Sequence, residues 1–366
     1  GALRGCTFLL QQRHGTSTGV LPGEAQGITF QAKLGSMLDK SERIEAITPL
    51  LCTALHLSPS DSAAVQQAAR LCMADLGSAV VMEFTGLAGI MGQHYAEREG
   101  LGEEVSRAIF ECVLPRSAGD QLPETAPGLV LSLATRLDSL VGLFAIGCEP
   151  SASADPFGLR RSAYGLVEAL VASNTDLHLS TALQAAASVQ PVEVSPGTLE
   201  QVQSFIVRRL EQLLVDGGAA VEAVRSVLEE RGSVPALAAR SVAEMEELQA
   251  SGQLEKIVAA YARPTRIVRG KEVDLEWQVR EELFESDAER TLWDAFKKVD
   301  AEVSSDMSIK AFADASMALI DPLEGFFANV FVMAEEEQLR KNRLGLLTRI
   351  ARLPEGIADL TVLPGF

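Results

Sequence analysis

The chain has 366 residues, which favours two domains, and 32 basic against 50 acidic residues give it a formal net charge of −18. That balance argues against a protein whose whole surface binds nucleic acid or anionic membrane, but a compact basic site can persist because salt screens charges beyond about 8 Å. The five cysteines form no C-x-x-C pair and no apolar run reaches the roughly 20 residues that span a bilayer, so a zinc ribbon, a disulfide framework and membrane contact are not expected.

Residues 1–27 show no sustained hydrophobic period, and residues 11–27 are rich in glycine, threonine, serine and glutamine. We expect this segment to be poorly ordered or an artefact of splicing. The globular pattern begins near Gly27, and from there helix signals dominate.

Helix start and stop signals follow one another along the rest of the chain. Ser58-Pro59-Ser60-Asp61 places serine at an N-cap, proline at the first helical position and an acid at N3. Further starts are expected at Asp155-Pro156, at the capping box Thr198-Leu199-Glu200-Gln201 and at Asp321-Pro322, and Gly217-Gly218 is expected to end a helix. Alternating strand-like runs are scarce, so the sequence predicts an all-α protein.

The best domain boundary lies in residues 173–197, where asparagine, serine, proline and glycine separate two strongly helical regions. We therefore expect one helical domain over residues 28–175, a linker over residues 176–197 and a second helical domain over residues 198–366. A charged insert near residues 270–289 interrupts the second domain.

A metal centre inside a helical bundle is not favoured. A metal hydrolase of the HD class needs a His-Asp pair with further histidine and aspartate ligands, but the chain has only four histidines, and Asp75 follows Ala74. Asp138 adds at most a second carboxylate from a distant helix. Asp75 and Asp138 are therefore expected to form structural hydrogen bonds or to cap helix ends, and no metal or cofactor is expected to bind this chain.

Two basic islands, residues 256–271 and 339–352, contain no acid, and the first includes Tyr261. Arginine suits phosphate and base-edge contacts because its planar fork donates two hydrogen bonds at once, and an aromatic ring beside it can stack on an unpaired base. The competing interpretation is a solvated helix face paired with acids at 335–337 or 272–285, and composition alone does not decide between them. The candidate RNA-binding residues are Arg340, Lys341, Asn342, Arg343 and Arg349, the last expected on the same helix face as Arg340, and Arg263, Arg266, Arg269 and Lys271.

Arg160 and Arg161 form a further pair at the helix start expected after Asp155-Pro156. They are assigned either to RNA contact or to ion pairs within the fold, and the sequence leaves both interpretations open.

Short motifs occur in order along most of the chain. They include residues 30–40, Ala74-Asp75-Leu76, residues 136–142, the highly specific Asp155-Pro156-Phe157-Gly158-Leu159-Arg160-Arg161, Leu339-Arg340-Lys341-Asn342-Arg343-Leu344 and Leu363-Pro364-Gly365-Phe366. Together they resemble the β subunit of bacterial-type glycyl-tRNA synthetase, most closely the fused organellar form of plants and green algae. The resemblance is dense over residues 28–172 and 320–366.

This resemblance implies an HD-like helical domain followed by a DALR-type anticodon-binding domain related to that of arginyl-tRNA synthetase. In the family Ala74-Asp75 replaces a metal-binding His-Asp, so Asp75 and Asp138 would be vestigial metal positions. The chain would be the part of a glycine–tRNA ligase that recognises tRNA-Gly and its anticodon arm. Activation of glycine with ATP and Mg would belong to a class II catalytic α subunit or fused α portion, to which nothing in this chain is similar.

The family also implies a homo-oligomer formed through the full-length enzyme. It implies a location in the chloroplast, the mitochondrion or both, with the bacterial cytoplasm as the alternative. Two rival classes of function stay open: an HD-type metal phosphohydrolase, and a helical scaffold that docks the catalytic subunit and touches no RNA.

Overall fold

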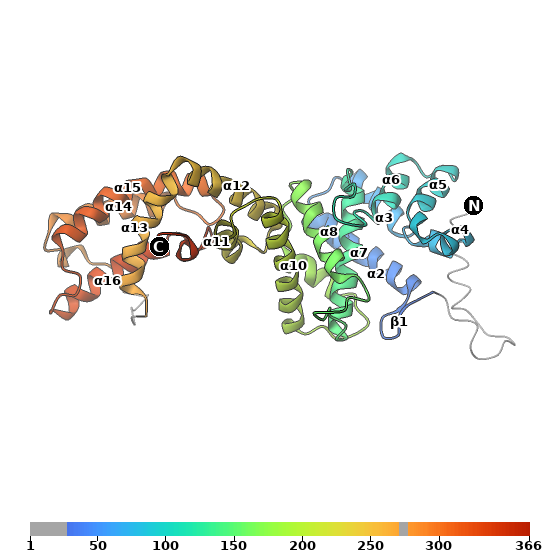
Figure 1. Ribbon diagram of the computed structural model, residues 1–366, viewed down its shortest axis with the longest axis horizontal. Helices are drawn as coiled ribbons and strands as arrows, with labels where there is room; N and C mark the ends of the chain where they lie inside the picture. Colours follow the sequence, from blue (N-terminus) through green and yellow to red (C-terminus); the bar gives the residue numbers. More distant parts are fainter. Residues whose placement is uncertain (1–27, 271–276) are drawn as a thin grey trace. The chain divides into compact units, whose positions relative to one another are not determined.

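The computed structural model describes residues 28–270 and 277–366 (Figure 1). Within these residues the chain forms fifteen α-helices, α2 to α16, and one short hairpin of β1 (Thr29–Gln31) and β2 (Gly35–Ser36). The all-α prediction is confirmed, whereas the expectations about residues 1–27 and Lys271 lie outside the described residues. Contacts divide the chain into unit 1, which covers residues up to Leu213 and Ser233–Ala236, and unit 2, which covers Leu214–Gly232 and Leu237–Phe366.

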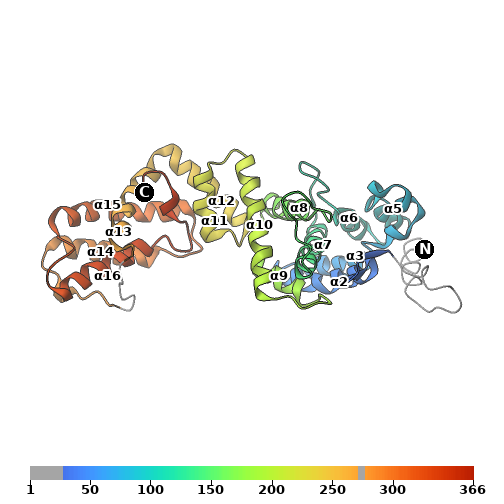
Figure 2. The ribbon, with the colours of Figure 1, turned by 60° about the horizontal axis from the view of Figure 1, so that its bottom comes forward.

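Unit 1 is built around α7 (Ala126–Ala145) (Figures 1 and 2). Thr125 starts this helix by accepting a hydrogen bond from the Gly128 N–H, and Pro127 lies in its first turn. The helices that pack most extensively on α7 are α2 (Met37–Ala54), α3 (Pro59–Ala69), α6 (Glu103–Glu111), α8 (Leu159–Ala172) and α9 (Leu179–Ala187). Between α3 and α6 run four short elements: η1 (Ala74–Gly77), α4 (Ala79–Glu83), η2 (Thr85–Leu87) and α5 (Ile90–Arg98).

The helix α7 corrects the expectation that no apolar segment reaches the length of a membrane span. Among the described residues it is the one helix long and apolar enough to cross a membrane by length and composition. Most of it is buried inside unit 1, because neighbouring helices cover it on nearly every side. A mostly apolar helix that is covered on nearly every side is typical of the centre of a helical domain.

Three of the predicted helix starts fall at or near the expected residues. The Ser58 hydroxyl accepts the Asp61 N–H at the start of α3, as predicted. The helix α8 begins at Leu159, after the predicted Pro156, because the Asp155 carboxylate accepts the N–H groups of Leu159 and Arg160. The helix α10 (Pro196–Asp216) begins earlier than the predicted capping box because the Ser195 hydroxyl accepts the Thr198 N–H, and it ends just before Gly217-Gly218, as predicted.

The start predicted at Asp321-Pro322 is wrong. Pro322 lies inside α15 (Ile309–Asn329), whose N-cap is Ser308. A proline inside a helix removes one N–H donor and costs about 3 kcal/mol in an isolated helix. Here the buried face continues on both sides of the proline, through Phe312 before it and Phe326 after it, so tertiary packing outweighs the local signal.

The segment predicted as a linker, residues 176–197, contains α9. The side chains of Leu179, Ala182 and Leu183 are buried, and α9 contacts α2 and α7. The segment is therefore a packed part of unit 1, and the division between the units falls after Leu213, within α10.

Unit 2 contains a bundle of four helices: α13 (Gln253–Val268), α14 (Asp287–Glu302), α15 and α16 (Glu337–Arg352). In it α13 packs against α15 and α16, and α14 packs along α15 (Figure 1). The buried Tyr261 hydroxyl pairs with Ser316 at 3.0 Å in this core. Unit 2 also contains α11 (Val221–Arg231), the part of α12 (Pro235–Ser251) from Leu237 onward, η3 (Glu281–Leu283) and η4 (Leu360–Val362).

Candidate nucleic-acid interface

The structure buries two of the five candidate residues predicted on α16. Arg343 donates from Nε to Glu289 Oε1 at 2.7 Å, from Nη2 to Glu285 Oε2 at 3.0 Å and from Nη1 to the Phe331 carbonyl at 3.0 Å. Burial alone would raise the pKa of Glu289, but hydrogen bonds from Arg343 and from the Ser286 and Glu285 amides outweigh it and hold that pKa below its ordinary value. The Arg343 guanidinium is thus fully engaged inside unit 2.

Asn342 has an exposed fraction of 0%. Its side-chain oxygen accepts the Arg280 N–H at 2.8 Å, and its side-chain nitrogen donates to the Arg280 carbonyl at 3.0 Å. The Trp277 indole N–H also points at this oxygen, at 3.4 Å. Asn342 and Arg343 therefore hold the segment 277–285 against α16, which corrects the prediction that they contact tRNA.

The other three candidates on α16 lie at the surface, on different sides of the helix. Arg340 donates from Nη1 to the carbonyls of Ala334 and Glu335, while Arg349 donates from Nη2 to the Trp277 carbonyl at 3.2 Å. Nine residues make two and a half helical turns, which places Arg340 and Arg349 on opposite faces and corrects the expectation of a shared face. Lys341 forms an ion pair with Glu337 at 2.6 Å.

A group that we call the Trp277 cluster gathers aromatic and basic side chains beside α16: Trp277, Arg280, Lys341 and Arg349. The Trp277 ring packs closely on Gly345. A Cβ added at position 345 would lie only 2.9 Å from the ring carbon Cδ1, so a larger residue would not fit there. The Arg280 guanidinium lies 5.0 Å from the ring centroid and the Lys341 ammonium 6.0 Å from it. Sequence reasoning missed Trp277 and Arg280, which lie outside both basic islands.

The first basic island forms an exposed surface on α13, which we call the α13 basic face: Lys256, Arg263, Arg266 and Arg269. Positions 256, 263 and 266 fall on one side of the helix, and Arg269 follows its last residue. The Arg263 guanidinium lies 4.1 Å from the centroid of the Phe327 ring of α15. In the part of the chain that the structure describes, Arg263, Arg266 and Arg269 form no ion pair with a carboxylate, whereas Glu272, Asp274 and Glu276 of the predicted alternative lie outside the described residues.

The loop between α15 and α16 carries an exposed aromatic residue that the sequence analysis did not single out. Phe331 has an exposed fraction of 75%, whereas its neighbours Val330 and Val332 are buried. The Phe331 carbonyl accepts a hydrogen bond from Arg343, and the Ala334 carbonyl in the same loop accepts one from Arg340. The signal that could have found it is the apolar run Val330-Phe331-Val332-Met333 directly after a helix, in which alternate residues cannot all be buried.

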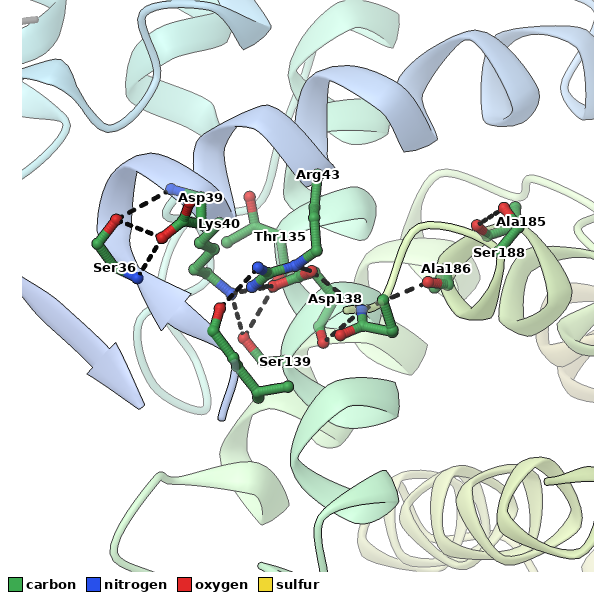
Figure 3. A network of polar contacts seen from close by, with 12 residues as sticks. Ser36, Asp39, Lys40, Arg43, Thr135, Asp138, Ser139, Ala185, Ala186 and Ser188 are labelled. Atoms are coloured by element: carbon green, nitrogen blue, oxygen red, sulfur yellow. Dashed lines mark hydrogen bonds and ion pairs between the residues drawn. The ribbon is translucent and has the colours of Figure 1, made fainter. Parts of the chain in front are cut away.

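In unit 1, Asp138 is enclosed by cations instead of by metal ligands (Figure 3). Lys40 Nζ lies 2.9 Å from Asp138 Oδ2, and Arg43 Nε lies 2.6 Å from Oδ1. Gln190 donates to the same carboxylate at 3.1 Å. Burial alone would raise the pKa of Asp138, but Lys40 and Arg43 outweigh it and lower that pKa.

Asp75 belongs to a different contact. Its Oδ2 atom accepts the Gly89 N–H at 2.7 Å and the Gly92 N–H at 3.0 Å, at the start of α5. Burial raises the pKa of Asp75, against these hydrogen bonds. The two aspartates thus serve separate structural contacts, and among the described residues no group of three histidine, cysteine, aspartate or glutamate side chains could hold a metal ion.

Arg160 and Arg161 lie at the start of α8. Arg160 donates from Nη2 to the Ser151 carbonyl at 2.6 Å. The Arg161 guanidinium folds back over Gly158, where Nη2 lies 2.8 Å from the position that a Cβ would take. Neither arginine forms an ion pair with a carboxylate among the residues described, so the predicted structural ion pair does not occur in this part of the chain.

Comparison with known proteins gives two family matches. Residues 9–229 match the family described as Glycyl-tRNA synthetase beta subunit, and residues 257–359 match the DALR anticodon binding domain. The first match covers the whole predicted HD-like domain and the start of the second domain. The second match contains α14, α15, α16 and most of α13, and with them the α13 basic face apart from Lys256.

Curated relatives agree with these matches. A protein of Arabidopsis thaliana, "Glycine--tRNA ligase, chloroplastic/mitochondrial 2", is 51% identical over 343 residues, which are 94% of this chain and 32% of that protein. Proteins named "Glycine--tRNA ligase beta subunit" from Chromohalobacter salexigens and Trichodesmium erythraeum are 35% and 34% identical, and each match covers 92% of this chain and about half of the bacterial protein. The chain therefore spans a third to a half of the length of these relatives, and it belongs to the glycyl-tRNA synthetase beta subunit family.

Proposed function

We propose that the chain is the tRNA-binding part of a glycine–tRNA ligase, and that unit 2 contacts the anticodon arm of tRNA-Gly. The observation that carries this proposal is the α13 basic face, where three exposed arginines, which form no ion pair among the described residues, lie inside the match to the DALR anticodon binding domain. Unpaired guanidinium groups on a surface are available to phosphate oxygens, which they can bind through two parallel hydrogen bonds. Because the whole chain has a net charge of −18, this concentration of positive charge differs from the mainly acidic remainder of the protein.

Aromatic side chains beside these cations support contact with unpaired bases. Phe331 stands on a loop whose backbone is held by hydrogen bonds from Arg340 and Arg343, so that backbone needs little ordering when a base stacks on the exposed ring. The half-buried Trp277 ring is flanked by Arg280 and Lys341. Single-stranded loops of RNA are commonly recognised by such a combination of stacking and phosphate contacts.

In this proposal the chain positions tRNA and does not itself form bonds. A class II catalytic α subunit or fused α portion activates glycine with ATP and Mg, and the tRNA held by this chain delivers its 3′ end to that site.

Assembly into a homo-oligomer through the full-length enzyme and a location in the chloroplast or mitochondrion belong to the same proposal, as does the alternative of a bacterial cytoplasm. The metal phosphohydrolase is not proposed, because the Asp138 carboxylate is already neutralised by Lys40 and Arg43.

The test compares tRNA binding by the full 366-residue chain with binding by Arg263→Gln/Arg266→Gln. Lys298→Gln serves as the control, because Lys298 is an exposed cation of α14 in the same unit and lies outside the α13 basic face. We expect the double variant to lose at least tenfold in affinity for tRNA-Gly, and we expect the control to match the unaltered chain. Equal affinity in all three proteins would refute a role of the α13 basic face, and no binding by any of them would favour the docking scaffold without RNA contact.

A further inference from the structure

A second group of arginines lies in unit 1, on the part of α10 before Leu213. The Arg209 guanidinium lies 5.4 Å from the centroid of the Phe205 ring, which itself contacts Phe144 with ring centroids 5.2 Å apart. Arg209 donates from Nη1 to Gln212 at 3.3 Å. Its Nε atom is buried and has no hydrogen-bond partner. A buried donor without a partner is costly, so such a group points to a ligand that supplies an acceptor.

The charges around Arg209 are of the same sign. Burial lowers the pKa of Arg209, and the positive charges of Arg160 and Arg208 lower it further. A guanidinium nevertheless stays protonated at neutral pH, so three positive charges remain close together. Within the described residues Arg208 and Arg209 form no ion pair, and their repulsion is left without a compensating anion.

The carboxylates near this group do not remove the imbalance. Asp155 already accepts the N–H groups of Leu159 and Arg160 and so serves the start of α8. Glu211 is the acid that follows Arg208 and Arg209 on α10, and it has an interaction of its own. Arg161 adds a fourth guanidinium beside Gly158, where the backbone is left-handed with φ of 66°. Arg160 and Arg161 are thus neighbours at the start of α8, and Arg208 and Arg209 are neighbours on α10, with Arg160 close enough to Arg209 to lower its pKa.

We propose that Arg160, Arg161, Arg208 and Arg209 form a second phosphate-binding site, which takes backbone phosphates of the bound tRNA on unit 1. The proposal rests on the tRNA-binding function proposed above and adds a contact site outside the residues that match the anticodon binding domain. Phosphate fits because its several oxygens accept from more than one guanidinium fork at once, and because an anion relieves the repulsion between the arginines. The aromatic pair Phe144 and Phe205 keeps the Arg209 guanidinium in place before the ligand arrives.

The first experiment measures binding of tRNA-Gly to the full chain over a range of salt concentrations. Arg209→Gln is compared with Arg98→Gln, which removes one exposed arginine of α5 elsewhere in unit 1. We expect Arg209→Gln to lower affinity about tenfold at low salt and to make the slope of log affinity against log salt shallower by about 0.7 to 0.9, the effect of losing one phosphate contact. The same affinity and slope in Arg209→Gln as in Arg98→Gln would overturn the proposal.

A second experiment uses the unaltered chain, so it does not depend on how a variant folds. The Arg209 Nε–H resonance is followed by NMR while tRNA-Gly or, separately, inorganic phosphate at matched ionic strength is added. We expect tRNA to shift this resonance at stoichiometric amounts and inorganic phosphate to shift it only at concentrations at least a hundredfold higher. If the resonance responds to micromolar inorganic phosphate and not to tRNA, the proposal is wrong, and the site binds a small phosphate ligand instead of the RNA backbone.

These experiments separate failure of the second site from failure of the proposed function. If the unaltered chain binds tRNA and Arg263→Gln/Arg266→Gln weakens it, but Arg209 does not respond, then only the second site is wrong. If the unaltered chain binds no tRNA at any salt concentration, both are wrong.

Discussion

At the scale of single residues, chemically similar arginines have opposite roles in unit 2. Arg343 is buried and bonded to Glu285 and Glu289, whereas Arg263 is exposed and its guanidinium lies against the Phe327 ring. Both belong to acid-free stretches of sequence, so local composition could not distinguish them. The glutamates that engage Arg343 lie more than fifty residues earlier, and only the folded bundle brings them together.

Truncation of Arg343 tests this difference. Arg343→Ala leaves the buried Glu289 carboxylate without its cation, so we expect a loss of about 3 to 5 kcal/mol in the free energy of unfolding. Arg263→Ala removes an exposed side chain, and we expect a change within about 0.5 kcal/mol. Urea denaturation of both variants measures the two values. A stable Arg343→Ala protein would contradict the structural role assigned to this residue.

The buried carboxylate of Asp138 predicts a dependence of stability on pH. Its pKa is lower in the folded chain than in the unfolded chain, so its contribution is fully present above the unfolded value of about 3.9 and is lost as the pH falls through the folded value. Asp138→Asn removes the charge at every pH. We therefore expect the unfolding free energies of the unaltered chain and the variant to differ most above about pH 5 and to approach each other as the pH falls below the unfolded pKa and through the folded pKa. A difference that stays constant from pH 6 to pH 3 would contradict the assigned ion pairs.

At the scale of elements, the segment 277–285 depends on α16 for its position. Asn342 satisfies both backbone groups of Arg280, and Trp277 rests on Gly345. We expect Asn342→Ala to cost about 1 to 3 kcal/mol, because buried polar groups lose their partners. We also expect faster hydrogen exchange at the Arg280 amide, with α13 and α15 unchanged. Uniform loss of protection across unit 2 would show that Asn342 supports the whole bundle instead.

The helices themselves were largely predictable from local chemistry. Ser58 and Pro59 begin α3 as predicted, and Gly217-Gly218 follows the end of α10, because caps and glycines act over one turn. Pro322 failed as a start signal because packing of Phe312 and Phe326 carries α15 past it. The segment 176–197 failed as a linker because its loop-forming residues flank a short helix with a buried face.

The site was predictable in part for a related reason. The sequence indicated that residues 263–269 are basic and free of acids, and the structure leaves those arginines without carboxylate partners among the residues it describes. It could not indicate which side of α16 is covered, because that depends on the distant segment 277–285. Phe331 and the arginine group around Arg209 were missed because their significance lies in exposure and in neighbours from other elements.

At the scale of the whole molecule, a strongly acidic chain carries a group of arginines in each unit that forms no ion pair among the described residues. In unit 2 the group lies within the anticodon-binding match, and in unit 1 it lies on α8 and α10. Contacts of this kind draw their binding energy from the release of counterions from phosphate, so affinity must fall as salt rises. A purely helical docking scaffold would show no such linkage to RNA.

The most direct measurement is the affinity of the full chain for tRNA-Gly and for a non-cognate tRNA across salt concentrations from 50 to 200 mM, the range in which such linkage is usually resolved. We expect a linear fall of log affinity with log salt, with a slope of several units, and tighter binding of tRNA-Gly at every salt concentration. Affinity that is independent of salt, or the absence of binding to either tRNA, would contradict it.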